Sequence, residues 1–140
     1  MPNLFTYGTL EIPEVMQAVT GCTFVSIEAT AHGFARFLLQ GRIYPGMIPN
    51  SKEATCGRLY FDVDLNALKV LDEFEDEVYR RQLISLQTQD GKSFEAFSYV
   101  IAVEDRGRLT SQPWCRDYFV THHLHEYLKS CQVFYREMTS

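Results

Sequence analysis

The chain has no apolar run long enough to cross a bilayer, and it has no cluster of basic residues. A membrane span needs about 20 consecutive apolar residues, and a nucleic-acid surface needs concentrated positive charge. The formal net charge is −5, and Arg80-Arg81 is only a pair. The first residues have the pattern of a strand, not that of a basic segment followed by an apolar one. The sequence therefore predicts a cytoplasmic protein with neither a membrane nor a nucleic acid as partner.

Cysteines at metal-binding or redox spacing are also missing. The four cysteines are far apart and form no C-x-x-C pair: Cys22, Cys56, Cys115 and Cys131. This distribution favours isolated thiols over a metal or redox cluster, and we expect the thiols to be buried. His122, His123 and His125 fall within one predicted helix, but no cysteine or carboxylate supports them at a clear spacing. A helix surface that carries histidines is the favoured interpretation, and no metal or other cofactor is expected.

Neither a long disordered segment nor a second domain is indicated. A chain of 140 residues suits one domain with a real core, and its 46% hydrophobic and 22% charged residues are ordinary globular values. No repeat, low-complexity segment or linker divides it. We expect a single domain over residues 1–140, present as a monomer or a small homo-oligomer.

The stretch Leu4-Phe5-Thr6-Tyr7-Gly8-Thr9-Leu10 is where we expect a binding site to form. Its first four residues favour a half-buried strand, which the glycine interrupts. Pro13 suits the first turn of a helix, and Gly21 can end that helix. A strand that turns at a glycine toward a helix leaves backbone N–H groups unpaired, and these attract an anion. We therefore predict that Tyr7, Gly8, Thr9 and Leu10 hold the acidic end of a small substrate.

The rest of the chain alternates between strand and helix patterns. Strands are predicted over residues 22–30, 34–39, 55–63, 78–87 and 94–103, with a hairpin turn at Asp90-Gly91. Residues 41–50 contain two prolines and two glycines and are predicted to be a loop. Asp64 suits the cap of a helix over 65–75, and 111–131 have the spacing of one long amphipathic helix. This order predicts an α+β fold, a small and largely antiparallel barrel-like sheet flanked by helices.

Of the five acidic residues around Phe74, one stands on the apolar face of its predicted helix. Leu68, Leu71 and Phe74 contribute to that face, and Glu75 follows Leu71 by four residues. A carboxylate aimed at the core is costly unless it is paired or given a cavity. In a cavity its pKa would rise towards neutrality, as a general base needs. A buried glutamate satisfied by a structural arginine or by backbone donors is the alternative that the residues leave open.

Several motifs follow one another in a specific order. They are LFTYGTL, Tyr44-Pro45-Gly46, Gly57-x-Leu59-Tyr60, Leu71-Asp72-x-Phe74-Glu75 and Tyr79-x-Arg81, with Trp114 at the opening of the last helix. From residue 4 to about residue 128 the chain resembles the γ-glutamylcyclotransferase-like family, which includes the avirulence-induced-gene-like proteins. YGTL followed at this distance by LDxFE is the most specific part of the resemblance.

The resemblance implies a small mixed fold around a barrel-like sheet, and cyclisation of a γ-glutamyl compound to 5-oxoproline with release of an amine. It implies that Tyr7, Gly8, Thr9 and Leu10 form the substrate-holding loop and that Glu75 is the catalytic glutamate. The nucleophile is the substrate's own amine, from which Glu75 would take a proton. The implied partner is a small γ-glutamyl molecule.

Two positions depart from the family pattern. Asp76 stands where a glycine usually follows the catalytic glutamate, and aspartate tolerates a left-handed backbone better than most residues. Glu11 follows the loop and would repel an additional acidic group. Asp76 also favours the alternative function, a non-catalytic small-molecule binding module with the same fold. An oligomeric scaffold is a third hypothesis, for which exposed apolar residues on the last helix would be the sign.

Aromatic side chains are predicted mainly to pack. Four tyrosines on or near the strands could line a pocket with their hydroxyls, but core or barrel packing is the favoured interpretation: Tyr44, Tyr60, Tyr79 and Tyr99. Trp114 is expected to anchor the start of the last helix.

Overall fold

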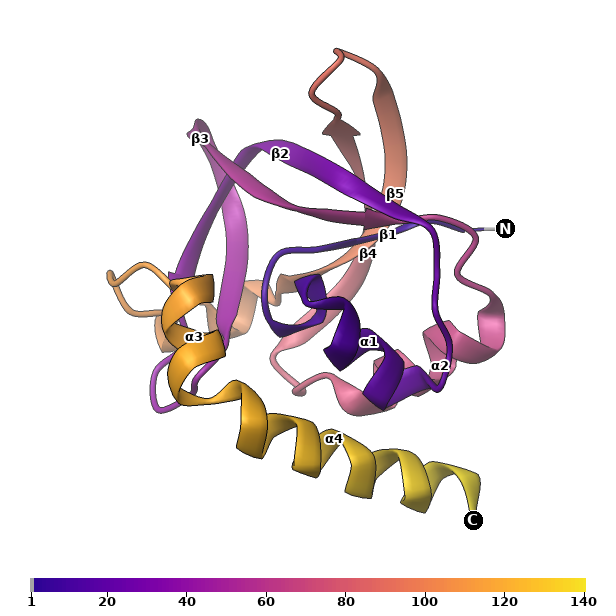
Figure 1. Ribbon diagram of the computed structural model, residues 1–140. Coiled ribbons are helices and arrows are strands. Elements are labelled where there is room, and N and C mark those ends of the chain that lie inside the picture. The colour runs from indigo at the N-terminus through magenta and orange to yellow at the C-terminus, as the bar shows by residue number, and fades with distance from the viewer. Residues whose placement is uncertain (1) are drawn as a thin grey trace.

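The computed structural model describes residues 2–140, in which five strands close into a barrel with helices packed outside it (Figure 1). The order around the barrel is β1-β3-β2-β4-β5, and β1 closes it by pairing antiparallel with β3 and parallel with β5. The strands are β1 (Leu4–Thr6), β2 (Ser26–Leu38), β3 (Pro45–Tyr60), β4 (Tyr79–Gln87) and β5 (Ser93–Ile101). The predicted α+β fold with a barrel-like sheet is confirmed.

The helices lie on one side of the barrel, where α4 runs beneath α1 (Figure 1). Their bounds are α1 (Pro13–Thr20), α2 (Leu65–Phe74), α3 (Arg116–His122) and α4 (Leu124–Thr139), with short 3-10 helices η1 (Thr9–Glu11) and η2 (Val103–Arg108). As predicted, Gly21 ends α1 with φ of 74°, a conformation that glycine adopts without strain. The Asp64 carboxylate caps α2 by accepting from the Ala67 amide at 2.8 Å.

The two larger of three hydrophobic clusters lie on opposite faces of the strands. Phe5, Leu59 and Val100 pack inside the barrel, while Leu4 and Tyr60 pack outside it against the helices. This follows from the alternation of side chains along a strand. The first strand therefore ends at the boundary between the two cores, and residues 7–10 continue along that boundary.

Residues 22–38 do not form two strands as predicted. The strand begins only at Ser26, and it continues without interruption to Leu38. Its register against β3 shifts between His32 and Phe34, where Gly33 has φ of 84°. Residues 50–53 of β3 lie opposite Gly33 alone, so the glycine marks an irregularity in the pairing of one continuous strand and not a turn between two.

The loop predicted over residues 41–50 is wrong in its second half. Pro45 opens β3, which runs through Gly46 and Pro49 to Tyr60. In the described chain, this half of β3 is paired along one side only, by β2. Proline is tolerated at the first residue of a strand and along an unpaired side, so the prolines do not end the strand here.

The single helix predicted over residues 111–131 is also wrong. It begins at Arg116, is interrupted at His123, and continues to Thr139. His123 leaves the helical region with φ of −128° and ψ of −24°, which bends the chain between α3 and α4. The bend lets Phe119 pack on Trp114, whose ring centroid lies 5.9 Å away, while α4 turns along α1. Trp114 is buried, which confirms its predicted role as an anchor.

The cysteines were predicted to be buried, and three of the four are exposed: Cys22, Cys56 and Cys115. They fall on strand edges, turns and a helix start, which the sequence pattern does not distinguish from the core. Cys131 alone is buried, between α4 and the core. In the part of the chain that the structure describes, no helix is long and apolar enough to span a membrane.

Gly57 marks the closest approach of β1 and β3, and we expect Gly57→Ala to destabilise the barrel. A Cβ at this position would overlap the Thr6 carbonyl oxygen and the Phe5 ring. Because the obstacle is backbone, the free energy of unfolding should fall by about 3 kcal/mol in a urea titration. Gly107→Ala is the matched control, since a Cβ there meets nothing within 4 Å. Equal stabilities of the two variants would contradict this account.

Candidate active site

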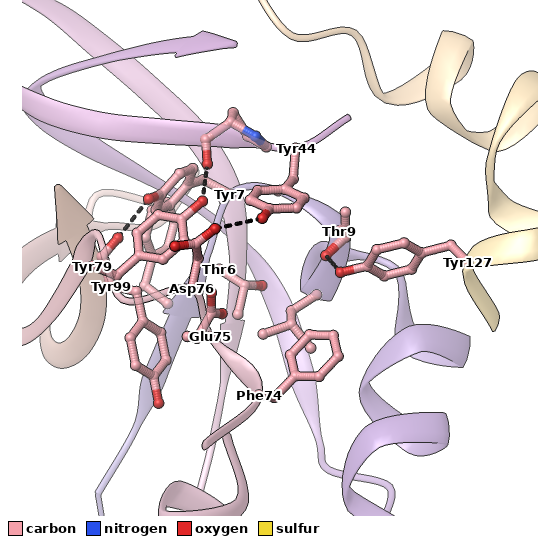
Figure 2. Close-up of a pocket in the computed structure, with 14 residues that line it drawn as sticks. Thr6, Tyr7, Thr9, Tyr44, Phe74, Glu75, Asp76, Tyr79, Tyr99 and Tyr127 are labelled. Carbon is pink, nitrogen blue, oxygen red and sulfur yellow. Dashed lines mark hydrogen bonds between the residues drawn. The ribbon is translucent and has the colours of Figure 1, made fainter. Parts of the chain in front are cut away.

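A cavity of about 300 Å³ lies between the stretch after β1 and the end of α2. Its walls come from residues 5–10, from 44–45, from 74–76, and from one tyrosine each on β4, β5 and α4. In Figure 2 the aromatic side chains gather around Glu75 and Asp76. The structure thus brings Tyr7, Gly8, Thr9, Leu10 and Glu75, which the sequence placed in one site, to a single cavity.

Residues 7–10 use all their backbone carbonyl groups in hydrogen bonds. The carbonyls of Gly8 and Thr9 accept from amides three residues further on, at 3.0 and 3.2 Å, and form the turn of η1. The Tyr7 carbonyl accepts from Arg36 at 2.7 Å, and the Leu10 carbonyl accepts from the Tyr60 hydroxyl at 2.8 Å. The acceptors of the stretch are therefore satisfied by the protein itself.

The amide groups of the same stretch, unlike its carbonyl groups, are not satisfied by the protein. Within residues 2–140, no backbone or side-chain acceptor takes a hydrogen bond from the N–H of Gly8, Thr9 or Leu10. Buried amides almost always have a partner, so three free ones beside a cavity suit an acceptor that enters it. Their role in holding a substrate stays a prediction. Gly8 packs closely against Pro45, since a Cβ at this position would lie 2.9 Å from Pro45 Cδ.

Glu75 lies at the end of α2 as its C-cap, and its side chain faces the cavity. No hydrogen bond or ion pair to its carboxylate occurs among the residues that the structure describes. Burial, with the negative charges of Asp76 and Asp72 as the second and third causes, raises the pKa of Glu75 to about 8. Among the described residues, Glu75 is therefore not paired with an arginine, which was the alternative left open by the sequence.

The two aspartates beside Glu75 each accept hydrogen bonds from an arginine and a tyrosine. Asp72 accepts from Arg81 at 2.9 and 3.1 Å and from the Tyr99 hydroxyl at 2.6 Å. The arginines that could have neutralised Glu75 are thus bound elsewhere. Asp72 lies beside a neighbouring groove and does not line the cavity.

Asp76 lines the cavity and is the second of these aspartates. It accepts from the Tyr44 hydroxyl at 2.7 Å, from Arg42 at 3.3 Å and from the Val78 amide at 3.3 Å. Burial opposes ionisation, but these hydrogen bonds, that of Tyr44 first, lower the pKa of Asp76. Among residues 2–140, Asp62 is the one non-glycine residue with positive φ. Asp76 therefore needs no left-handed backbone, and replacing the family's glycine leaves this turn unstrained.

The tyrosines act as cross-links as well as walls. Tyr7 donates to the Tyr99 carbonyl and Tyr79 to the Pro45 carbonyl, both at 2.5 Å (Figure 2). Burial raises the pKa of Tyr44 to about 12 and raises those of Tyr7 and Tyr79 well above the ordinary tyrosine value, so all three hydroxyls stay protonated at neutral pH. Tyr44, Tyr79 and Tyr99 line the cavity, whereas Tyr60 lies in the outer core.

Tyr127 and Arg36 were not found from the sequence. Tyr127 reaches the cavity from α4, and its hydroxyl lies 3.1 Å from Thr9 Oγ1 (Figure 2). Its position on an apolar helix face indicated only packing. Arg36 is one arginine in a strand, and nothing in the pattern of β2 distinguishes it from other strand residues.

Two further sequence expectations concern residues outside the cavity. Glu11 was expected to repel an acidic group of the substrate. It does not line the cavity, and its carboxylate lies 4.0 Å from Arg36 instead. His122 and His125 are exposed near the junction of α3 and α4. In the described chain, no three potential ligands are grouped to hold a metal ion.

Comparison with known proteins gives relatives over nearly the whole chain. AIG2-like protein D of Arabidopsis thaliana is 29% identical over 140 residues, covering 99% of this chain and 91% of the relative. Gamma-glutamylaminecyclotransferase A of Danio rerio is 32% identical over 122 residues, covering 74% and 71%. A solution structure from Arabidopsis thaliana, 25% identical, covers 92% of this chain and 87% of that chain with a TM-score of 0.70.

The sequence model of one family, described as "Gamma-glutamyl cyclotransferase, AIG2-like", matches residues 4–116. That span contains the barrel, α1 and α2, and every cavity residue except Tyr127. The chain is therefore a member of the AIG2-like gamma-glutamyl cyclotransferase family.

Proposed function

We propose that this protein is a cyclotransferase that converts a γ-glutamyl amine or γ-glutamyl amino acid to 5-oxoproline and releases the amine. One observation carries the proposal: a carboxyl group with a pKa near 8 faces the same cavity as three backbone amides, and neither has a hydrogen-bond partner within the described residues 2–140. A base of that pKa is half ionised near pH 8 and partly ionised at neutral pH, and the amides suit the substrate's carboxylate.

In this mechanism the substrate's α-amine attacks its own γ-carbonyl carbon. Glu75 removes a proton from the amine as the new C–N bond forms, and negative charge develops on the carbonyl oxygen. Glu75 then donates that proton to the leaving nitrogen as the original γ-amide bond breaks. The products are 5-oxoproline and the free amine. No residue of the protein forms a covalent bond to the substrate, because nucleophile and electrophile belong to one molecule.

The cavity supplies the geometry that this ring closure needs. Amides of Gly8, Thr9 and Leu10 fix the α-carboxylate, so that the amine beside it lies near the γ-carbonyl. The tyrosines keep their protons and hold the wall rigid, which leaves Glu75 as the group that exchanges protons. The name of the Danio rerio relative, a gamma-glutamylamine cyclotransferase, supports an amine as the leaving group.

The alternative, a binding module without turnover, was favoured by Asp76 in place of glycine. Asp76 makes hydrogen bonds away from Glu75 and occupies an ordinary backbone conformation. Its charge also contributes to the raised pKa of Glu75, which assists a general base. These observations favour the enzyme, and the two variants below separate the hypotheses.

Replacing Glu75 by glutamine is the direct test of the base. Glutamine has nearly the same shape but accepts no proton at neutral pH, so we expect release of 5-oxoproline to fall by a factor of about 100 or more. The assay uses a panel of γ-glutamyl amino acids and amines with detection of 5-oxoproline. Glu73→Gln is the control, because Glu73 lies two residues earlier in the chain, is exposed and does not line the cavity. Turnover by Glu75→Gln close to that of the control would refute the assignment.

The pH profile of kcat/KM follows from the state of Glu75 in the free enzyme. The base works only when ionised, and its pKa is raised, so activity should increase with pH and reach half its limit near pH 8. Asp76→Asn removes one of the charges that raise this pKa, and the rising limb should move to lower pH. If kcat/KM of the wild type instead rises near pH 4.5, Glu75 is not in the buried, negatively charged environment described above.

A further inference from the structure

We propose that Arg36, which does not itself line the cavity, is a positioning residue that aims the Gly8 amide of the loop at the substrate. The inference deepens the proposed function, because it assumes that those amides hold a carboxylate. Arg36 does not line the cavity, so it would act through the backbone and not by touching the substrate.

The contacts of Arg36 place it on the outer side of the loop. One guanidinium nitrogen, Nη1, donates to the Tyr7 carbonyl at 2.7 Å and to the Cys56 carbonyl at 3.2 Å. Arg36 belongs to β2 and Cys56 to the paired strand β3. The side chain therefore ties the loop after β1 to the two longest strands of the barrel.

Peptide geometry converts this contact into an orientation of the donor. The peptide bond between Tyr7 and Gly8 is trans, so the carbonyl of one residue and the N–H of the next point in opposite directions. Because Arg36 holds the Tyr7 carbonyl outward, the Gly8 N–H is turned the other way, toward the cavity. Without Arg36 this peptide could rotate and present its carbonyl to the substrate, where an acceptor would repel a carboxylate.

Arg36 is itself held in place. Its guanidinium lies 5.5 Å from the centroid of the Trp114 ring and 4.0 Å from the Glu11 carboxylate, and a quarter of its side chain is exposed. The planar group can serve a carbonyl, a carboxylate and an aromatic face together. A lysine has a single ammonium nitrogen and no planar face, so it would keep the charge but only part of this arrangement.

The test measures the loop and its ligand by NMR on ¹⁵N-labelled full-length protein, with 5-oxoproline as the probe. In the wild type, the Gly8 amide resonance should shift as the probe binds. Arg36→Met should raise the Kd about tenfold, the effect of losing one hydrogen bond that involves a charged group, and Arg36→Lys should fall between. On any accepted γ-glutamyl substrate, KM should rise more than kcat falls.

Arg58→Met is the matched control. Arg58 lies on β3 beside this region and donates to Ser26 Oγ at 3.0 Å, away from the loop carbonyls. It should leave the Kd unchanged, while thermal unfolding of both Met variants shows any general loss of stability. If Arg36→Met does not fold, Arg36→Lys is judged in its place by the same comparison.

The outcomes separate the two proposals. If the wild type binds the probe and the Arg36 variants bind it equally well, Arg36 is not a positioning residue, whatever its effect on stability. If the wild type shows no binding, the proposed function of the loop fails. Arg36 is then judged by the ¹⁵N heteronuclear NOE of Gly8 in the free protein. A lower NOE in the Arg36 variant supports its hold on the loop, and an unchanged one overturns it.

Discussion

The carboxyl group of Glu75 at the end of α2, which has no hydrogen-bond partner within residues 2–140, is the constraint on which the rest of the site depends. Its neighbours Asp72 and Asp76 each take an arginine and a tyrosine, so the positive charges nearby are already bound. Placing an ionised carboxylate in such surroundings is unfavourable, and the pKa rises as a result. The same arrangement that costs stability keeps a proton acceptor available near neutral pH.

The opposite wall of the cavity shows the complementary pattern. The four backbone carbonyls of residues 7–10 are bound by the turn of η1, by Arg36 and by Tyr60, while three amides have no acceptor among the residues that the structure describes. A cavity with donors on one wall and a weak acid on the other suits a molecule that has a carboxylate and an amine to be deprotonated. The barrel makes this possible because β1 ends between its two cores, which leaves residues 7–10 outside any strand pairing.

Local patterns predicted the parts of the fold that depend on local chemistry. Asp64 capped its helix, Gly21 ended α1, and the spacing from Leu71 placed Glu75 on the cavity. Predictions failed where long-range pairing decides the outcome. Gly33 and Pro45 were read as turns, but β2 and β3 pair on both sides of Gly33, and their pairing includes Pro45. Arg36 and Tyr127 reach the loop from elements distant in the sequence, and their roles exist only after the barrel and α4 are assembled.

The most direct test of this account is the titration of Glu75 itself in the free protein. The carboxyl carbon of glutamate reports its ionisation by ¹³C NMR, and Glu75→Gln identifies the resonance by its disappearance. We expect a midpoint near pH 8, because burial and two neighbouring aspartates disfavour the charged form. A midpoint near the ordinary value of 4.5 would show that the carboxylate is solvated or paired, and the account of the site would be wrong.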